Sequence, residues 1–244
     1  MAALTDAFDE RLAEVETYLD LLKVMEERAQ DGPPRFEGAA SPITTQQQKI
    51  LYSSVYLQLY NLVESTMTRC IDAIAEAARM NPGWMPGDLT IELRTEWVRV
   101  TARTHVELTP QHRLESALAL CEHLVSSLPI GSFAIEKGGG GNWDDGAIEA
   151  ISGRLGFRLQ VSRDVYNNIK RRVKDDLGPL GLVKRLRNEL AHGSISFTEC
   201  AEDATVAWLV ELKDKTASYL REVVARFVSY IEAHEYLIPE KRPA

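Results

Sequence analysis

The sequence has few cysteines and no hydrophobic run long enough to cross a bilayer. Its three cysteines, Cys70, Cys121 and Cys200, are odd in number and far apart, so they predict reduced thiols rather than a disulfide framework or a zinc site. No apolar stretch approaches the roughly 20 residues that a membrane-spanning helix needs. The first residues also lack a basic segment followed by a hydrophobic one. We therefore expect a cytoplasmic protein without a membrane segment.

Patterns typical of β-strands are nearly absent, and no internal repeat is found. The 244 residues are 45% hydrophobic, which excludes a disordered chain and is enough for one domain with a substantial core. We expect a single domain over residues 1–244 with a core over about 44–236. An N-terminal helix over 4–30 and an irregular insertion over about 129–161 complete this expectation.

Apolar residues recur at spacings of three and four along most of the chain, which is the period of an amphipathic helix. These stripes predict helices that are listed here by residue range: 4–30, 44–80, 89–105, 110–128, 144–155, 178–193 and 209–231, with a brief extended piece over 157–161. The stripe of the fourth helix consists of Leu114, Leu118, Cys121, Leu124 and Leu128. The economical architecture is an all-α, antiparallel helical bundle with a small irregular insertion.

Positive charge is concentrated in one part of an acidic chain. The net charge is −8, yet residues 158–187 hold nine basic side chains and three acidic ones. Such a basic cluster is expected of a surface that binds phosphate groups, although a solvated helix face explains it equally well. The candidate RNA-binding residues are Lys184, Arg185, Arg171, Arg172 and Lys174.

The basic cluster leads into the stretch Leu186-Arg187-Asn188-Glu189-Leu190-Ala191-His192-Gly193, at the end of a predicted helix. An arginine can grip a phosphate through a fork of hydrogen bonds, and a histidine can accept or donate a proton near neutral pH. These residue types at this spacing are suited to RNA cleavage without a metal ion. Arg187, His192 and Asn188 are therefore the candidate catalytic residues.

Helix geometry separates the two key side chains of this motif. Each residue turns about 100°, so Asn188 and His192 project together, whereas Arg187 and His192 diverge by about 140°. One histidine cannot easily serve as both the base and the acid of the reaction. We therefore predict a homodimer in which two chains meet about a two-fold axis and form a composite site.

A structural role explains the same motif without chemistry. Arginine and histidine near the C-terminal end of a helix also complement the helix dipole. The spacing is common as well, because Arg99 and His105 form a similar pair that no glycine follows. The alternative function is accordingly a non-catalytic helical module that binds RNA or a protein.

Other candidate sites carry less weight. The remaining histidines lack acidic or cysteine partners at metal-ligand spacing, so we expect neither a metal site nor a cofactor. Gly138 to Gly141 predict a mobile loop. A phosphate-binding P-loop is not expected there, since no strand precedes these glycines and no Lys-Ser or Lys-Thr pair follows them. Tyr60, Asn61 and Glu64 place polar groups on the central helix that could support the site, or could simply face solvent.

The arginine, the asparagine and the histidine four residues later resemble the signature of HEPN-domain ribonucleases. Two longer stretches, 51–64 and 182–193, are similar to the MAE-type branch of HEPN-like nucleases, and the resemblance runs from Thr44 to Leu220. HEPN-domain ribonucleases are helical bundles found in toxin–antitoxin, restriction-linked and phage-defence systems.

The resemblance implies a metal-independent endoribonuclease that acts as a homodimer on RNA, with Arg187 and His192 catalytic and Asn188 as the polar residue after the arginine. It implies 2′,3′-cyclic phosphate ends and a partner that is an antitoxin or a restriction or defence protein. Some HEPN toxins carry a tyrosine two residues after the histidine that a partner nucleotidyltransferase modifies. This chain has Ser194 there, which argues against silencing by that route.

Overall fold

A computed structural model describes residues 2–29, 32–35, 38, 41–80, 83–131, 133–137 and 142–243. Every regular element within these ranges is a helix, and the β pairs there are isolated bridges. The α-helices are α1 (Ala2–Ala29), α2 (Thr45–Met80), α3 (Ile91–Thr101), α4 (Pro110–Val125), α5 (Asp145–Arg154), α6 (Arg163–Lys170), α7 (Pro179–Ala191), α8 (Phe197–Cys200) and α9 (Val206–Glu232). The expected all-α class is thus confirmed, and none of the described helices is long and apolar enough to cross a bilayer.

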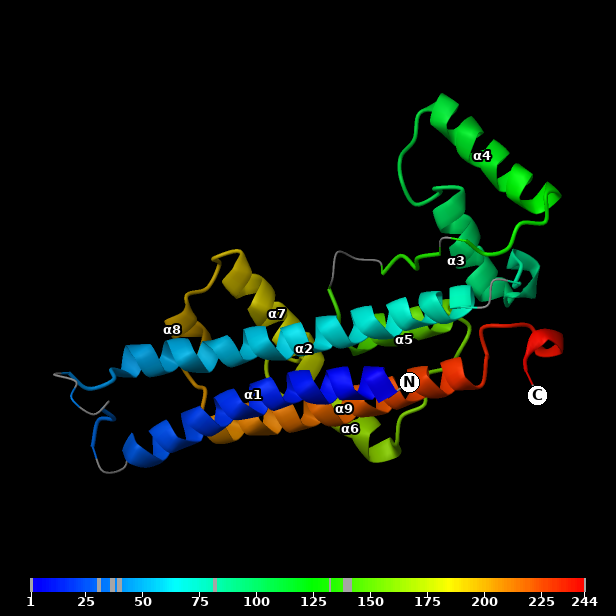
Figure 1. Ribbon diagram of the computed structural model, residues 1–244. Helices are drawn as coiled ribbons and strands as arrows, with labels where there is room; N and C mark the ends of the chain where they lie inside the picture. The colour runs from blue at the N-terminus through cyan, green and yellow to red at the C-terminus, as the bar shows by residue number, and fades with distance from the viewer. Residues whose placement is uncertain are drawn as a thin grey trace.

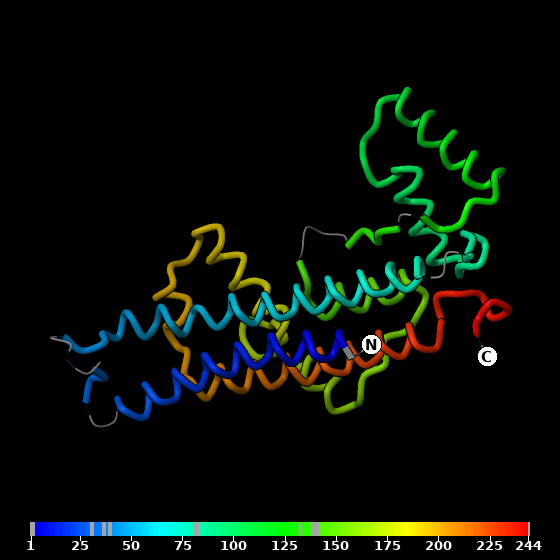
Figure 2. Tube along the Cα trace, viewed as in Figure 1, coloured from blue at the N-terminus to red at the C-terminus, as the bar shows by residue number. Residues whose placement is uncertain are grey.

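Three long helices, α1, α2 and α9, pack side by side and form the body of the molecule (Figures 1 and 2). Helix α1 runs antiparallel to α2, and α9 runs in the direction of α2 because the intervening chain returns to the beginning of α2 before α9 starts. The start of α2 is capped by Thr44. The Gln47 amide donates to the Thr44 hydroxyl over 3.2 Å, and the Thr44 amide donates to the Gln47 side chain over 2.8 Å.

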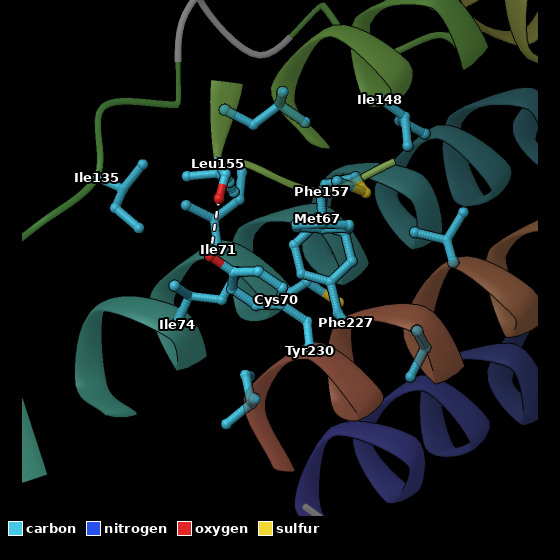
Figure 3. Close-up of a cluster of buried hydrophobic side chains, with 14 of the residues drawn as sticks. Met67, Cys70, Ile71, Ile74, Ile135, Ile148, Leu155, Phe157, Phe227 and Tyr230 are labelled. Carbon is cyan, nitrogen blue, oxygen red and sulfur yellow. Dashed lines mark hydrogen bonds between the residues drawn. The ribbon is translucent and has the colours of Figure 1, made fainter. Parts of the chain in front are cut away.

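The core consists of two clusters of buried residues along α2. One cluster joins the first half of α2 to α1, α7, α8 and the first part of α9. The other joins the second half of α2 to α3, α5 and the end of α9. Figure 3 shows part of the second cluster, where Met67 and Ile71 of α2 face Phe227 and Tyr230 of α9. The buried Tyr230 hydroxyl donates to the Leu155 carbonyl over 2.8 Å, so this polar group is satisfied inside the core.

Helix α7 begins and ends at the residues that the sequence predicts. Pro179 occupies its first turn and Gly178 precedes it, where a side chain would bring a Cβ atom within 2.5 Å of the Ile169 carbonyl oxygen. Gly193 follows the helix with a φ of +70°, a left-handed conformation that glycine adopts without strain. The backbone of this motif is therefore fixed at both ends.

Three parts of the chain differ from the expectation. The insertion over 129–161 contains the predicted short helix, α5, but residues 157–161 form no strand. Helices α6 and α8 have no counterpart among the predicted helices. Helix α4 exists as expected but stands away from the bundle (Figure 1). Its stripe of leucines is therefore exposed and not packed inward. The predicted loop Gly138 to Gly141 lies outside the described residues.

Candidate active site

Burial of one face of α7 determines where its polar residues lie. Four apolar residues along one face of α7 are buried in the two core clusters: Leu180, Val183, Leu186 and Leu190. Because this face packs inward, Arg187 and Asn188 are placed at its border, where each is half-buried. His192 comes one position after the last helical residue.

Arg187 is held by Tyr60 and Glu64 of α2 and by its neighbour Asn188. Its guanidinium carbon lies 3.7 Å from the centroid of the Tyr60 ring, which is a close cation–π contact. One of its nitrogens donates to the Glu64 carboxylate over 3.3 Å, and another donates to the Asn188 side-chain oxygen over 2.8 Å. About a quarter of the Arg187 side chain remains exposed, so the guanidinium is oriented and still accessible.

Tyr60 is a buried support beneath this arginine. Burial raises the pKa of its hydroxyl, and the Trp143 amide and the Arg187 guanidinium offset this effect only in part. The hydroxyl therefore stays protonated near neutral pH, and its oxygen accepts the Trp143 backbone N–H over 3.1 Å. The ring face is thus free to stack on Arg187 while its edge is anchored to the chain before α5.

The segment 142–144 lies over the polar side of α7. The Asn188 side-chain amide donates to the Asn142 side-chain oxygen over 3.0 Å, and the Lys184 ammonium is paired with the Asp144 carboxylate. Asp144 also caps α5 by accepting the Ala147 amide over 2.8 Å. Two of the predicted site residues are therefore tied to a segment that lies 40 or more positions earlier in the sequence.

His192 is the exposed end of the motif. It forms the C-cap of α7 and donates its backbone N–H to the Asn188 carbonyl over 3.0 Å. Among the described residues, none forms a hydrogen bond or an ion pair with its imidazole ring. The ring is thus available to a substrate, but it shares no hydrogen bond with Arg187, which is turned toward α2.

The basic cluster is largely neutralised by carboxylates of the same chain. Arg172 pairs with Asp176 at 2.8 Å, Lys174 lies 3.5 Å from Asp203, and Arg185 pairs with Asp175. Arg171 follows α6 and is exposed, and within the described ranges it has no ion pair. The predicted RNA-binding residues therefore lie near α7, but most of their charge is already balanced.

Sequence reasoning missed several members of the site because their partners are distant along the chain. Asn142 and Asp144 carry no motif of their own, and only the fold brings them to Asn188 and Lys184. Of the three candidates on α2, Tyr60 and Glu64 contact Arg187, whereas Asn61 is exposed. The only indication in the sequence was their spacing, since Tyr60 and Glu64 are four residues apart and so lie on the same face of α2.

The arrangement contains no recognisable metal centre in the part of the chain that the structure describes, where His, Cys, Asp and Glu side chains do not gather in threes. Its chemical features are an oriented guanidinium, an accessible imidazole and an amide that bridges two segments. Such a set can bind an anion and transfer a proton.

A family comparison agrees with this fold. The family model described as MAE_28990-like HEPN matches residues 1–236. The chain therefore belongs to the MAE_28990-like HEPN family. Comparisons with curated proteins and with solved structures gave no match.

Proposed function

We propose that this HEPN protein is a metal-independent endoribonuclease that cleaves RNA at a site shared by two chains. The observation that carries the proposal is the geometry of α7. Arg187 is stacked on Tyr60 and hydrogen-bonded to Glu64, while His192 is exposed at the end of the same helix. An oriented cation and an accessible proton carrier are the two groups that the reaction needs.

The reaction uses the RNA's own 2′-hydroxyl as the nucleophile. A base removes its proton, the 2′-oxygen attacks the adjacent phosphorus, and the bond between phosphorus and the 5′-oxygen breaks as an acid protonates that oxygen. The products are a 2′,3′-cyclic phosphate and a free 5′-hydroxyl, so no water or cofactor is consumed. Arg187 stabilises the extra negative charge on the phosphorane, and His192 transfers the protons.

A single chain offers one His192 for two proton transfers. Two chains related by a two-fold axis near the exposed end of α7 bring together two copies of Arg187, Asn188 and His192. One imidazole then acts as the base and the other as the acid. Asn188, which already contacts Arg187, holds the guanidinium in the orientation that the phosphate requires.

RNA binding places phosphates beside the basic residues around α7. Arg171 is free to contact the backbone directly, within the described chain, whereas the pairs of Arg172 and Lys174 are exposed. Exposed pairs contribute little stability, so a phosphate can replace their carboxylates at small cost. Lys184 and Arg185 lie one turn before Asn188 and extend the polar side of α7.

The biological role that this activity fits is that of a toxin or effector in a toxin–antitoxin, restriction-linked or phage-defence system. Cleavage of RNA harms the cell that produces the protein, so a partner or a trigger is required to control the activity. Ser194 stands where some HEPN toxins carry a modifiable tyrosine, which favours control by protein binding.

The test is incubation of the wild type, His192→Ala and His112→Ala with a mixed RNA pool in excess chelator. His112 is a matched control because it is also exposed, on α4. We expect the wild type and His112→Ala to produce 2′,3′-cyclic phosphate ends, and His192→Ala to lose cleavage by a factor on the order of 10²–10⁴. Salt-sensitive RNA binding without cleavage by any protein would instead support a non-catalytic RNA-binding module.

Mixing subunits tests the composite site separately. If both histidines act on one phosphate, a dimer with one His192→Ala chain is inactive, and activity follows the square of the wild-type fraction. An equal mixture of exchanged subunits then keeps about one quarter of the activity. A linear decrease to about one half would show that each chain cleaves alone.

A further inference from the structure

Helix α4 is joined to the bundle along a narrow strip of its surface. Its buried and partly buried residues, Ser116, Leu120 and His123, face α3, where the His123 ring lies 4.9 Å from the Trp97 ring. Figure 1 shows α4 projecting from the body beyond the end of α2. The rest of its circumference is exposed.

The exposed side of α4 is apolar over its whole length. Leu114, Leu118 and Leu124 are 55%, 59% and 55% exposed, and Val125 is 82% exposed. Cys121 lies on the same side and is exposed too. Residues 114, 118, 121 and 125 have the spacing of four, three and four that packs one helix against another. A continuous apolar face of this kind on a projecting helix indicates an interaction surface.

A groove borders this face on one side. It has a volume of about 470 Å³ and lies between α4 and the turn that precedes it. Its apolar lining includes Val106 and Leu108 of the turn and Ala117 and Cys121 of α4. The groove gives a partner a concave edge against which apolar side chains can pack, in addition to the stripe itself.

The two edges of the apolar face carry opposite charges. Arg103 and Arg113 line the groove on one edge. Glu115 and Glu122 lie on the other edge, since they are about 160–200° around α4 from Arg113. Within the described residues these four side chains form no ion pairs, in contrast to the basic residues around α7. Each edge therefore presents two charges of one sign to whatever covers the face.

We infer that α4 is the docking site for an amphipathic helix of a second protein, with basic residues along one edge of its apolar stripe and acidic residues along the other. Such a helix lies on Leu114, Leu118 and Cys121 with its basic edge over Glu115 and Glu122 and its acidic edge over the two arginines. A second copy of α4 packed antiparallel about a two-fold axis fits less well, because each edge then faces an edge of its own sign. A copy packed parallel has complementary edges, and the oligomeric state measured below tests that case.

This inference does not rest on the proposed ribonuclease. The candidate site contacts the middle of α2 through Tyr60 and Glu64, whereas α4 follows the end of α2 at Met80. A helix docked on α4 therefore leaves Arg187 and His192 uncovered.

The first experiment measures the binding of two designed helical peptides to the full chain by fluorescence anisotropy. Both have the same composition and the same apolar stripe. The uniform-edge peptide has lysines along one edge and glutamates along the other, whereas the mixed-edge peptide exchanges one lysine with one glutamate. Because a helix can bind in either direction, the first always has a fully complementary orientation and the second never has one. We expect the uniform-edge peptide to bind about tenfold more tightly.

Protein variants connect the result to α4. Leu118→Asp should abolish the binding of both peptides, and Glu115→Lys combined with Glu122→Lys should remove the preference between them. Circular dichroism checks that each variant keeps its helicity, which is expected because all three positions are exposed. Absence of binding, or equal binding of the two peptides, overturns the inference. So does a wild type that is a dimer and becomes a monomer with Leu118→Asp in ultracentrifugation, since a second copy then covers the face.

Discussion

Helices α7 and α4 have similar apolar stripes but opposite surroundings. Along α7 the stripe is buried, as Leu180 and Val183 show with exposures of 1% and 0%. Along α4 the leucines at the same helical spacing are more than half exposed. The charges differ in the same way. The cations of α7 are paired with carboxylates of the chain, whereas those bordering α4 form no ion pair with any residue that the structure describes. The comparison shows that periodicity identifies a face that requires a partner, but not which molecule supplies it.

The largest expected difference between the two stripes is the effect of a leucine-to-alanine substitution on the free energy of unfolding. Leu180→Ala removes a buried side chain and should lower the free energy of unfolding by about 2–5 kcal/mol. Leu118→Ala removes an exposed one and should change it by less than about 0.5 kcal/mol. Urea denaturation followed by circular dichroism measures both. A large loss for Leu118→Ala would mean that α4 is buried in solution.

Replacing one arginine on each helix by alanine should show that RNA cleavage depends on the candidate active site and not on the docking surface. Arg187→Ala removes the oriented guanidinium and should lower RNA cleavage by a factor on the order of 10²–10³, as loss of one transition-state donor does. Arg113→Ala should leave cleavage unchanged because Arg113 borders the groove of α4. Single-turnover rates with saturating enzyme check both. Equal rates for the wild type and Arg187→Ala would contradict a catalytic role for this residue.

The N-caps of two helices offer a smaller contrast. Thr205 accepts the Trp208 amide at the start of α9 over 3.2 Å, and Thr109 accepts the His112 amide at the start of α4 over 3.3 Å. Thr205→Ala should lower the free energy of unfolding by about 1 kcal/mol, since α9 belongs to the core. Thr109→Ala should leave it unchanged and should only speed hydrogen exchange within α4. Mass spectrometry of exchanged peptides distinguishes the local effect from the global one.

The ion pair of Lys184 should give α7 a weak pH dependence that α4 lacks. Burial alone would raise the pKa of Asp144, but the Lys184 ammonium and the Ala147 amide outweigh it and lower that pKa. The contribution of Asp144 to stability is therefore present above its unfolded pKa of about 3.9 and is lost as the pH falls through the folded value.

Asp144→Asn keeps a cap for α5 but loses the charge. Between pH 5 and pH 3, wild-type stability should decrease more than that of the variant, by less than about 1 kcal/mol for a partly exposed pair. Glu115→Gln is the control on α4, since Glu115 has no ion pair there among the described residues. Identical pH profiles for the wild type and Asp144→Asn would show that the pair contributes nothing.

The fold was predictable where local chemistry determines it. The period of α2 and α9, the proline that opens α7 and the left-handed Gly193 that closes it are all readable in the sequence, because each acts within a few residues. The exposure of α4 was not readable. A stripe such as that of Leu114 and Leu118 has the same pattern whether the partner belongs to the chain or to another molecule.

The candidate site was predictable only as a motif. Arg187, Asn188 and His192 are close in sequence, so their helix and their spacing indicated them directly. Of the groups that orient them, Tyr60 and Glu64 were indicated as polar residues on the central helix, whereas Asn142 carries no motif and reaches α7 only through the packing of distant segments. Of the carboxylates that pair with the basic cluster, Asp175 and Asp176 lie within it, whereas Asp144 and Asp203 reach it only through folding. Local charge counts do not include partners that folding supplies.

The exposed thiol of Cys121 allows a chemical label to be attached selectively to α4. Cys70 and Cys200 are buried, and burial raises the pKa of both thiols, that of Cys70 to about 12. Cys121 is exposed in the groove. A thiol-reactive photo-crosslinker added to the native protein will therefore attach at this one residue. Illumination in an extract then links the label to any polypeptide seated on α4, so that mass spectrometry can identify the molecule and the residues that occupy the groove.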